Sequence, residues 1–192
     1  PDLDPIFSTW INNNNDGYED IIAVRRPGSN FGDPYVSEIL EFDSINQYNT
    51  ISIQLSTQSI LSIHAFDFDL DQDDDIMIRK EGRTEFFRNN GDNQYELFHT
   101  LDEISSFSIN DFNNDGYPDF VFSERFQNPD QIKTRLLLNS AGEKFTESSI
   151  DIFPPFFEGN IIANDLDNDG DIDLIFSSLN RLAVTEVYWN DW

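Results

Sequence analysis

One acidic segment of nine residues occurs four times along the chain, and this repeat constrains the fold more than any other feature of the sequence. Its positions follow the pattern [DN]-x-[DN]-x-D-[G]-x-x-D, and the copies align without gaps. They span residues 12–20, 67–75, 111–119 and 165–173, and we refer to them as loops 1 to 4. Successive copies begin 44 to 55 residues apart, a period that is typical of one four-stranded β-propeller blade per repeat.

Short runs rich in Val, Ile, Phe and Tyr surround each loop in the same order. An apolar run precedes the loop, a second run follows it directly, and a third run comes before a turn such as the Asn-Asn-Gly of residues 89–91. Runs of this length and composition, bounded by turn residues, predict strands. No window shows a 3.6-residue apolar period, so we predict no helix.

The repeat predicts an all-β fold, a β-propeller of four-stranded antiparallel blades in which each acidic loop joins the first strand of a blade to the second. We expect one domain over residues 1–192, with blades at about 1–57, 58–104, 105–155 and 156–192. The last unit ends after its third run, so four blades are present and the last is incomplete. Either strand exchange around the ring supplies the missing fourth strand of the last blade, or the chain ends before its full array of blades.

The residue types in the loops point to calcium. Ca²⁺ takes six to eight hard oxygen ligands in flexible geometry. Side chains at positions 1, 3 and 5 can point at one centre, glycine at position 6 permits a sharp turn, position 7 can offer its backbone carbonyl, and Asp at position 9 can reach back. Magnesium fits less well, because it demands octahedral geometry and keeps its waters. An EF-hand is excluded, since its twelve-residue loop ends in Glu and leads into a helix.

Turn formation is the simpler explanation for these residues, because Asp and Asn bond to their own backbone. It accounts for one or two positions, but not for Asp at position 9 in all four copies. Four copies at regular spacing therefore favour metal binding.

The four loops resemble the calcium loops of FG-GAP/VCBS repeats, the blades of integrin-α-like propellers, and the resemblance covers nearly the whole chain. It implies a secreted or cell-surface protein used in adhesion, with up to four largely structural Ca²⁺ ions. By matching position it implies side-chain ligands at Asn12, Asn14, Asp16, Asp20, Asp67, Asp69, Asp71, Asp75, Asp111, Asn113, Asp115, Asp119, Asp165, Asp167, Asp169 and Asp173. The position 7 residues Tyr18, Asp73, Tyr117 and Asp171 would offer carbonyls.

The chain departs from the family pattern in three ways. Loop 1 has Asn at two ligand positions, loop 2 has Gln72 in place of Gly, and only four blades are found where the family usually has about seven. Because affinity follows ligand charge and rigidity, we predict that loop 4 binds most tightly, loops 3 and 2 less so, and loop 1 most weakly.

The formal net charge of −26 argues against nucleic acids and anionic membranes as partners. Cysteine is absent, which excludes disulfide and thiolate chemistry, and the apolar runs are too short to span a membrane. The chain begins with Pro1 rather than Met, so we expect it to be processed or part of a longer protein.

Binding or assembly is a better prediction than catalysis. The only histidines, His64 and His99, lie in apolar runs, and we expect them to be packed or surface residues rather than catalytic ones. We expect an extracellular recognition module for a protein or a glycan. The alternatives are a structural subunit of a surface fibre, joined by strand exchange at the incomplete blade, and, less favoured, an accessory domain of a carbohydrate-active enzyme.

The basic residues suggest where a partner binds. Nine of the eleven Lys and Arg residues fall in or beside the connections between second and third strands, on the face opposite the acidic loops. Long, variable connections on a repeated scaffold often carry function. We therefore predict contacts from Arg25, Arg26 and Arg135 to an anionic glycan or an acidic protein surface. The alternative is that these cations only offset the acidic field.

Overall fold

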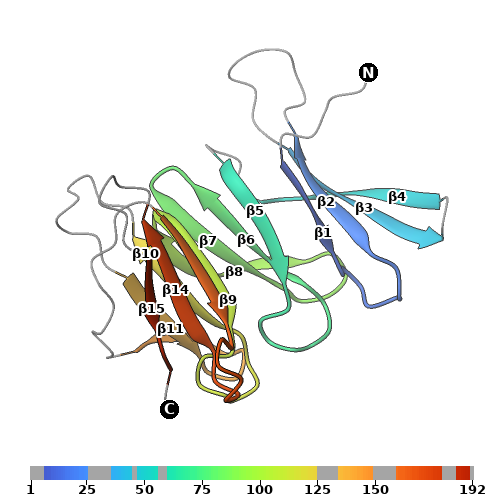
Figure 1. The fold of residues 1–192 in the computed structure, drawn as a ribbon. Helices are drawn as coiled ribbons and strands as arrows, with labels where there is room; N and C mark the ends of the chain where they lie inside the picture. Colours follow the sequence, from blue (N-terminus) through green and yellow to red (C-terminus); the bar gives the residue numbers. More distant parts are fainter. Residues whose placement is uncertain are drawn as a thin grey trace. The chain divides into compact units, whose positions relative to one another are not determined.

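The computed structural model describes residues 7–25, 36–44, 47–55, 60–124, 134–148, 159–178 and 185–190, and within them it contains strands and no helix (Figure 1). The strands form four antiparallel sheets. Sheet 1 consists of β1 (Phe7–Ile11), β2 (Asp20–Arg25), β3 (Val36–Ser44) and β4 (Gln47–Ile53). Sheet 2 consists of β5 (Ile60–Phe66), β6 (Asp75–Lys80), β7 (Arg83–Asn89) and β8 (Tyr95–Asp102). Sheet 3 consists of β9 (Ile104–Asn110), β10 (Asp119–Glu124), β11 (Thr134–Asn139) and β12 (Phe145–Glu147), and sheet 4 of β13 (Gly159–Asn164), β14 (Asp173–Ser178) and β15 (Thr185–Tyr188).

Strands that follow one another in the chain are neighbours in each sheet. The acidic loops join β1 to β2, β5 to β6, β9 to β10, and β13 to β14, so the predicted all-β fold and the placement of the loops are confirmed. Sheet 4 has three strands within the described residues. The arrangement of the sheets as blades of a closed propeller stays a prediction. Among the described residues, no helix is long and apolar enough to cross a membrane.

The chain divides into two compact units, residues 1–101 with sheets 1 and 2, and residues 102–192 with sheets 3 and 4. In each sheet the side chains alternate between two faces, and two cross-strand rows repeat. Row A contains the residue directly after position 9 of the loop and its partners on both sides. Row B contains the next residue and its partners, and it lies on the opposite face.

In the first unit, row B of sheet 1 packs against row A of sheet 2. Row B of sheet 1 is Thr9, Ile22 and Ile39, and row A of sheet 2 is Ala65, Ile76 and Phe87. Except for Thr9, these residues belong to one apolar cluster, in which both isoleucines of sheet 1 and Ile76 are fully buried. Strands β1 and β5 lie side by side (Figure 1). The two sheets therefore share one core.

The second unit repeats this packing. Row B of sheet 3 is Ser108, Val121 and Leu136, and row A of sheet 4 is Ala163, Leu174 and Tyr188. Val121, Leu136 and Leu174 are buried in one cluster, to which Ala163 and Tyr188 add partly buried side chains. In both units, then, the second sheet presents row A to row B of the first.

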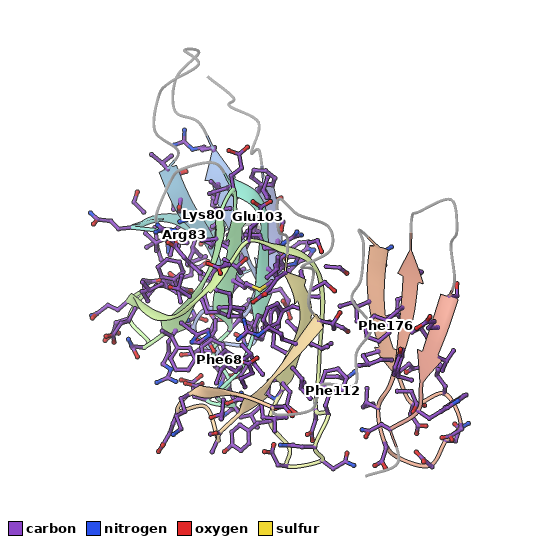
Figure 2. All side chains as sticks on the ribbon, turned by 90° about the vertical axis from the view of Figure 1, so that its left-hand side faces the viewer. Phe68, Lys80, Arg83, Glu103, Phe112 and Phe176 are labelled. Carbon is purple, nitrogen blue, oxygen red and sulfur yellow. The ribbon has the colours of Figure 1, made fainter. Side chains whose placement is uncertain are left out.

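An ion pair recurs at equivalent places where the second strand of a sheet ends. In sheet 1 it is Arg25 with Glu38, whose Nη2 and Oε1 atoms are 2.7 Å apart. In sheet 2 it is Lys80 with Glu85, both almost completely buried, at the end of the hairpin where Figure 2 labels Lys80 and Arg83. In sheet 3 it is Glu124 with Arg135, so there the acid and the base have exchanged strands.

Candidate metal centres

All four acidic loops have a left-handed backbone at the same two positions. Position 4 has a positive φ between 51° and 61°, and position 6 a positive φ between 81° and 101°. Glycine occupies position 6 in loops 1, 3 and 4, but in loop 2 Gln72 takes this conformation with φ 81°. The position 4 requirement was missed from sequence, although Asn, which tolerates positive φ, stands there in three loops. Leu70 takes the place of Asn in loop 2 with φ 61°.

Loop 2 therefore holds two residues in a conformation that ordinary L-residues rarely adopt. We expect Leu70→Asn and Gln72→Gly each to stabilise the protein by about 1 kcal/mol, because left-handed backbone at a residue other than Gly, Asn or Asp costs roughly 1–2 kcal/mol. Chemical denaturation of each variant with calcium present measures the change. The reverse substitution Asn168→Leu in loop 4 is the matched control and should destabilise by a similar amount. Unchanged midpoints in all three would contradict this account of the loop.

Side-chain oxygens fold each loop around a common centre. In every loop the position 7 N–H donates to Oδ1 of the Asp at position 5, at 2.9 to 3.0 Å. In loops 2, 3 and 4 the position 6 N–H donates to Oδ2 of the Asp at position 1, at 2.7 to 3.2 Å. The side chains at positions 1 and 5 thus turn toward the inside of the loop, where their remaining lone pairs can meet a cation.

The Asp at position 9 is buried in all four loops and ties the loop to the third strand. Oδ1 of Asp75 accepts the N–H of Asn89 at 2.7 Å, and Oδ2 accepts that of Phe68 at 3.1 Å. Asp119 and Asp173 make the same two contacts in their loops, and Oδ1 of Asp20 accepts the N–H of Phe42. This shared structural role explains why Asp is found at position 9 in every copy.

Burial of these carboxyl groups shifts their titration. Desolvation raises the pKa of Asp75 to about 8 and the pKa of Asp119 to about 6, although the two backbone N–H groups favour the charged form in each case. Desolvation also raises the pKa of Asp20. The other carboxylates of loops 2 and 3 raise the pKa values of Asp75 and Asp119 further, and a bound cation would reverse that effect.

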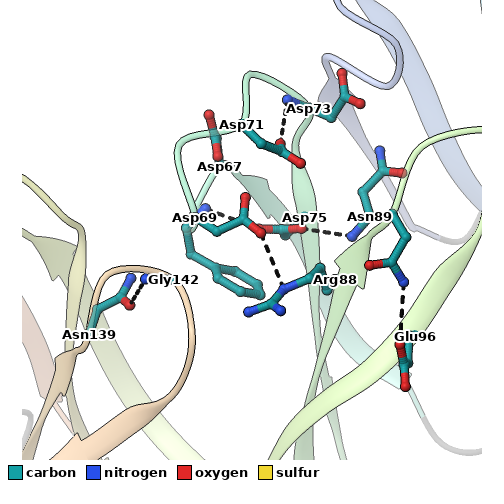
Figure 3. Close-up of polar contacts among 12 residues, drawn as sticks. Asp67, Asp69, Asp71, Asp73, Asp75, Arg88, Asn89, Glu96, Asn139 and Gly142 are labelled. Carbon is teal, nitrogen blue, oxygen red and sulfur yellow. Dashed lines mark hydrogen bonds and ion pairs between the residues drawn. The ribbon is translucent and has the colours of Figure 1, made fainter.

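Two loops bring three carboxylates close enough to share one ion. Oxygen atoms of Asp67, Asp69 and Asp71 all lie within 4.8 Å of one another, and so do oxygen atoms of Asp165, Asp167 and Asp173. In loop 2, Oδ1 of Asp67 and Oδ1 of Asp69 are buried and have no hydrogen-bond partner (Figure 3). Buried oxygens of this kind are costly unless a donor or a cation meets them, so the residues fit a hard cation such as Ca²⁺.

Two residues of the third strands alter the charge beside the loops, and neither was predicted. In sheet 2, Nε of Arg88 lies 3.2 Å from Oδ2 of Asp69 (Figure 3), and its guanidinium lies 4.4 Å from the centre of the Phe98 ring. At the equivalent place in sheet 1, Glu41 accepts a hydrogen bond from Nδ2 of Asn14 at 3.1 Å. Arg88 thus adds a positive charge beside loop 2, whereas Glu41 adds a carboxylate beside loop 1.

Loops of the same unit also contact one another. The backbone N–H of Asn12 donates to Oδ2 of Asp74 at 2.7 Å, and Nδ2 of Asn114 donates to Oδ1 of Asp171 at 2.5 Å. An amide at the end of the third strand joins each pair as well. Nδ2 of Asn89 donates to the carbonyl of Asn13 at 3.0 Å, and Nδ2 of Asn190 donates to the carbonyl of Phe112 at 3.2 Å.

Two of the three predicted partner-binding arginines form ion pairs. Arg25 makes two hydrogen bonds to Glu38, and Arg135 contacts both Glu124 and Glu147. Arg26 lies outside the described residues. Both histidines are half-buried, and burial lowers their pKa values. Nε2 of His64 lies 2.9 Å from Oγ of Ser62, and His99 packs edge-on against Phe86.

A comparison with protein-family models finds one family, described as an FG-GAP-like repeat. Its model matches twice, over residues 67–122 and 111–176. The first match begins at loop 2 and ends in β10, and the second begins at loop 3 and ends in β14. Each match therefore runs from one acidic loop through the next acidic loop and into the strand that follows it. No curated protein matches the chain.

Proposed function

The chain belongs to the FG-GAP-like repeat family, and we therefore propose that it is a calcium-stabilised β-propeller module for recognition or adhesion, at the cell surface or outside the cell. The observation that carries the metal assignment is the carboxylate cluster of loop 2, with its two buried oxygens that lack a hydrogen-bond partner. The cluster of Asp165, Asp167 and Asp173 in loop 4 supports it. The shared backbone of the four loops extends the proposal to loops 1 and 3.

In each loop the side chains at positions 1, 3 and 5 would hold the ion, together with the position 7 carbonyl. The Asp at position 9 would also be a ligand, as the grouping of Asp173 with Asp165 and Asp167 supports, while its oxygens hold the loop to the third strand. Oxygen-only ligands in a flexible loop favour Ca²⁺ over Mg²⁺. The ion would offset the repulsion among the loop carboxylates and so keep the first and second strands of each sheet together.

The propeller part of the proposal rests on the repeated packing of row B on row A in both units. One packing geometry applied to successive sheets is what a radial array of blades requires. A family of this kind and the half-buried histidines together favour binding over catalysis. Assembly into a fibre by strand exchange is the second candidate, favoured by β15, which lies at an edge of sheet 4 within the described part of the chain.

The ion pairs change the expected chemistry of a partner at the connections between second and third strands. Arg25 and Arg135 already pair with glutamates, which supports the view that these cations offset the acidic field. A partner at this end of the sheets would therefore meet paired charges, and it would need its own donors as well as acceptors.

The calcium proposal predicts a ranking of the four sites. Loop 4 offers four ligand carboxylates and a glycine turn, whereas loop 1 offers two, with Glu41 nearby. Arg88 lowers the affinity of loop 2 by its charge beside Asp69. Since affinity follows ligand charge and rigidity, we expect Asp167→Ala to weaken the tightest binding phase by about tenfold or more, and Asn14→Ala to affect only the weakest phase.

Isothermal titration of calcium into the metal-free protein measures this ranking. Glu143→Ala, which removes an exposed carboxylate outside the loops, is the matched control and should leave every phase unchanged. The calcium proposal is contradicted if the unaltered chain takes up no calcium. The ranking is contradicted if the loop 1 and loop 4 variants lose the same amount of calcium affinity.

A further inference from the structure

Asn12, the first residue of loop 1, makes three hydrogen bonds to loop 2 of the same unit. Its backbone N–H donates to Oδ2 of Asp74 at 2.7 Å, its carbonyl accepts the N–H of Asp74 at 2.6 Å, and its side-chain Nδ2 donates to the carbonyl of Gln72 at 2.8 Å. Gln72 and Asp74 occupy positions 6 and 8 of loop 2. Since position 1 is a ligand position of the proposed metal site, a ligand of loop 1 is held in place by loop 2.

The hydrogen bond from Nδ2 decides which atom of the Asn12 amide faces loop 1. An amide binds a cation only through its oxygen, because its NH₂ group is a donor. With Nδ2 bound to loop 2, Oδ1 lies within loop 1, where it accepts the N–H of Asn15 at 3.0 Å and keeps a lone pair for an ion. Oδ2 of the buried Asp20 has no hydrogen-bond partner, which also fits a cation in loop 1. Loop 2 therefore orients a ligand of loop 1.

Gln72 connects this contact to the ligands of loop 2. Its N–H donates to Oδ2 of Asp67, the position 1 ligand of that loop, at 2.9 Å. In the chain it lies between positions 5 and 7, which are both proposed ligands. An ion in loop 2 would hold these residues, and with them the carbonyl that orients Asn12. The side chain of Gln72 adds a contact to loop 1, because its Oε1 accepts a hydrogen bond from Nδ2 of Asn15 at 3.2 Å.

Two departures from the repeat pattern meet in this contact. An Asp at position 1, as in the other three loops, would place a carboxylate oxygen against the carbonyl of Gln72 and near the carboxylate of Asp74, whereas the amide of Asn12 offers a donor. A Gly at position 6 would lack the side chain that reaches loop 1. Loop 1 thus has one carboxylate fewer and loop 2 a less favourable backbone, and both features join the two loops.

The second unit orients its position 1 ligand differently. The carboxylate of Asp111 in loop 3 accepts the N–H groups of Asp115 and Gly116, at 3.1 and 2.7 Å, within its own loop. Position 8 of loop 4 is Ile172, whose side chain has no acceptor. The side-chain contact from loop 3 to loop 4 comes from Asn114 at position 4, which is not a ligand position. The bridge through a ligand side chain is therefore a feature of loops 1 and 2.

We propose that Asn12 is a positioning residue that couples loops 1 and 2, so that calcium in either loop raises the calcium affinity of the other by the same factor. The inference rests on the proposed calcium function and deepens it. The first ion orders the peptide groups that the two loops share, so less conformational freedom is lost when the second ion binds. Repulsion between the two ions acts in the opposite direction, and moderate salt screens it at these exposed loops. Loop 1, with only two ligand carboxylates, thus gains affinity from its neighbour.

A calcium titration of the full chain in moderate salt, followed by NMR, tests the coupling. The backbone amide of Gly17 reports on loop 1, and that of Gln72 reports on loop 2. The variant Asp67→Asn with Asp71→Asn disables loop 2. It removes two negative charges, as many as one bound Ca²⁺ would offset, so the net charge beside loop 1 matches that of the ion-filled loop 2. We expect the affinity of loop 1 to fall about fivefold or more in this variant, as for typical coupling between sites.

The role of Asn12 is tested by repeating this comparison in single-site backgrounds. With Asn12→Asp, the affinity of loop 1 should become nearly independent of loop 2. Asn14→Asp is the matched control, because it adds the same charge at position 3, where the side chain contacts Asp16 and Glu41, and it should keep the dependence. If Asn12→Asp does not fold, Asp74→Ala decides by the same criterion, since it removes the acceptor of the Asn12 N–H and leaves every ligand position intact.

The outcomes separate this inference from the calcium function on which it rests. The coupling is overturned if disabling loop 2 leaves the affinity of loop 1 unchanged, or if Asn12→Asp keeps the dependence that Asn14→Asp keeps. In both cases the loops still bind calcium, so the proposed function stands. If neither the Gly17 amide nor the Gln72 amide of the unaltered chain responds to calcium, the proposed function fails and the coupling fails with it.

Discussion

Removal of calcium is expected to destabilise the protein by roughly 2–6 kcal/mol. Each site of ordinary extracellular affinity, with Kd of about 10⁻⁴ to 10⁻³ M, stabilises by roughly 0.4–1.4 kcal/mol at ~1 mM calcium, and four sites add. The total is comparable with the whole stability of a typical domain, about 5–15 kcal/mol. Without the ions, carboxylates such as Asp67, Asp69 and Asp71 face one another within 4.8 Å.

Thermal unfolding with calcium and with excess EGTA measures this effect, and each kcal/mol should move the midpoint by about 2–4 °C. Asp92→Asn neutralises an exposed carboxylate in the turn after β7 and should leave the calcium-induced shift unchanged. The double variant Asp165→Asn with Asp167→Asn should reduce the calcium-induced shift of the midpoint, because it removes two ligand carboxylates of loop 4. If EGTA leaves the midpoint of the unaltered chain in place, the acidic loops lack the role assigned to them.

The pH dependence of stability should change sign when calcium is removed. In the metal-free protein, Asp75 has a pKa of about 8 and Asp119 a pKa of about 6, both above the unfolded value of about 3.9. Stability from these groups is therefore complete below pH ~4 and is lost as the pH rises through the folded values. Since each pKa unit corresponds to about 1.4 kcal/mol, Asp75 alone should cost on the order of 5 kcal/mol at pH 9 relative to pH 4.

With calcium bound, the dependence reverses, because the ion needs deprotonated ligands. Stability should then rise with pH as the loop carboxylates ionise. Glu38 should behave alike with and without calcium. Its partner Arg25 lowers its pKa, so the stability that Glu38 contributes is present above its unfolded-state pKa and is lost as the pH falls through its folded-state pKa.

Urea unfolding at pH 5, 7 and 9, in EGTA and in calcium, separates the two regimes. In EGTA, Asp75→Asn should flatten the slope by removing its titration, and Asp119→Asn should do so less and at lower pH. Stability that changes with pH in the same direction in both solutions would refute this account of the buried carboxyl groups.

The features that sequence predicted correctly are local ones. Strands alternate with turn residues over a few positions, and the acidic loops fall between the first and second strands as expected. The turn at Gln72 has the conformation that glycine adopts in the other loops. Such features depend on residues close together in the chain, which is why their pattern could be interpreted without a structure.

The features that were missed depend on residues brought together from different strands. Glu41 and Arg88 come from third strands about a dozen or more residues away from their loops, and only the strand register places them beside Asn14 and Asp69. The amide of Asn190 reaches a carbonyl 78 residues earlier in the chain. The two apolar clusters likewise depend on packing between sheets, which the spacing of the loops does not show.

The reversed ion pair of sheet 3 bears on how four similar sheets avoid misassembly. Repeat proteins risk incorporating a strand into the wrong repeat during folding. If β11 paired with β6, Arg135 would meet Lys80, and if β7 paired with β10, Glu85 would meet Glu124, in each case like charge against like charge. Lys80, Glu85 and Glu124 are nearly inaccessible to water, and breaking a buried pair costs about 3–5 kcal/mol. The reversed ion pair thus disfavours pairing between a strand of the second repeat and a strand of the third.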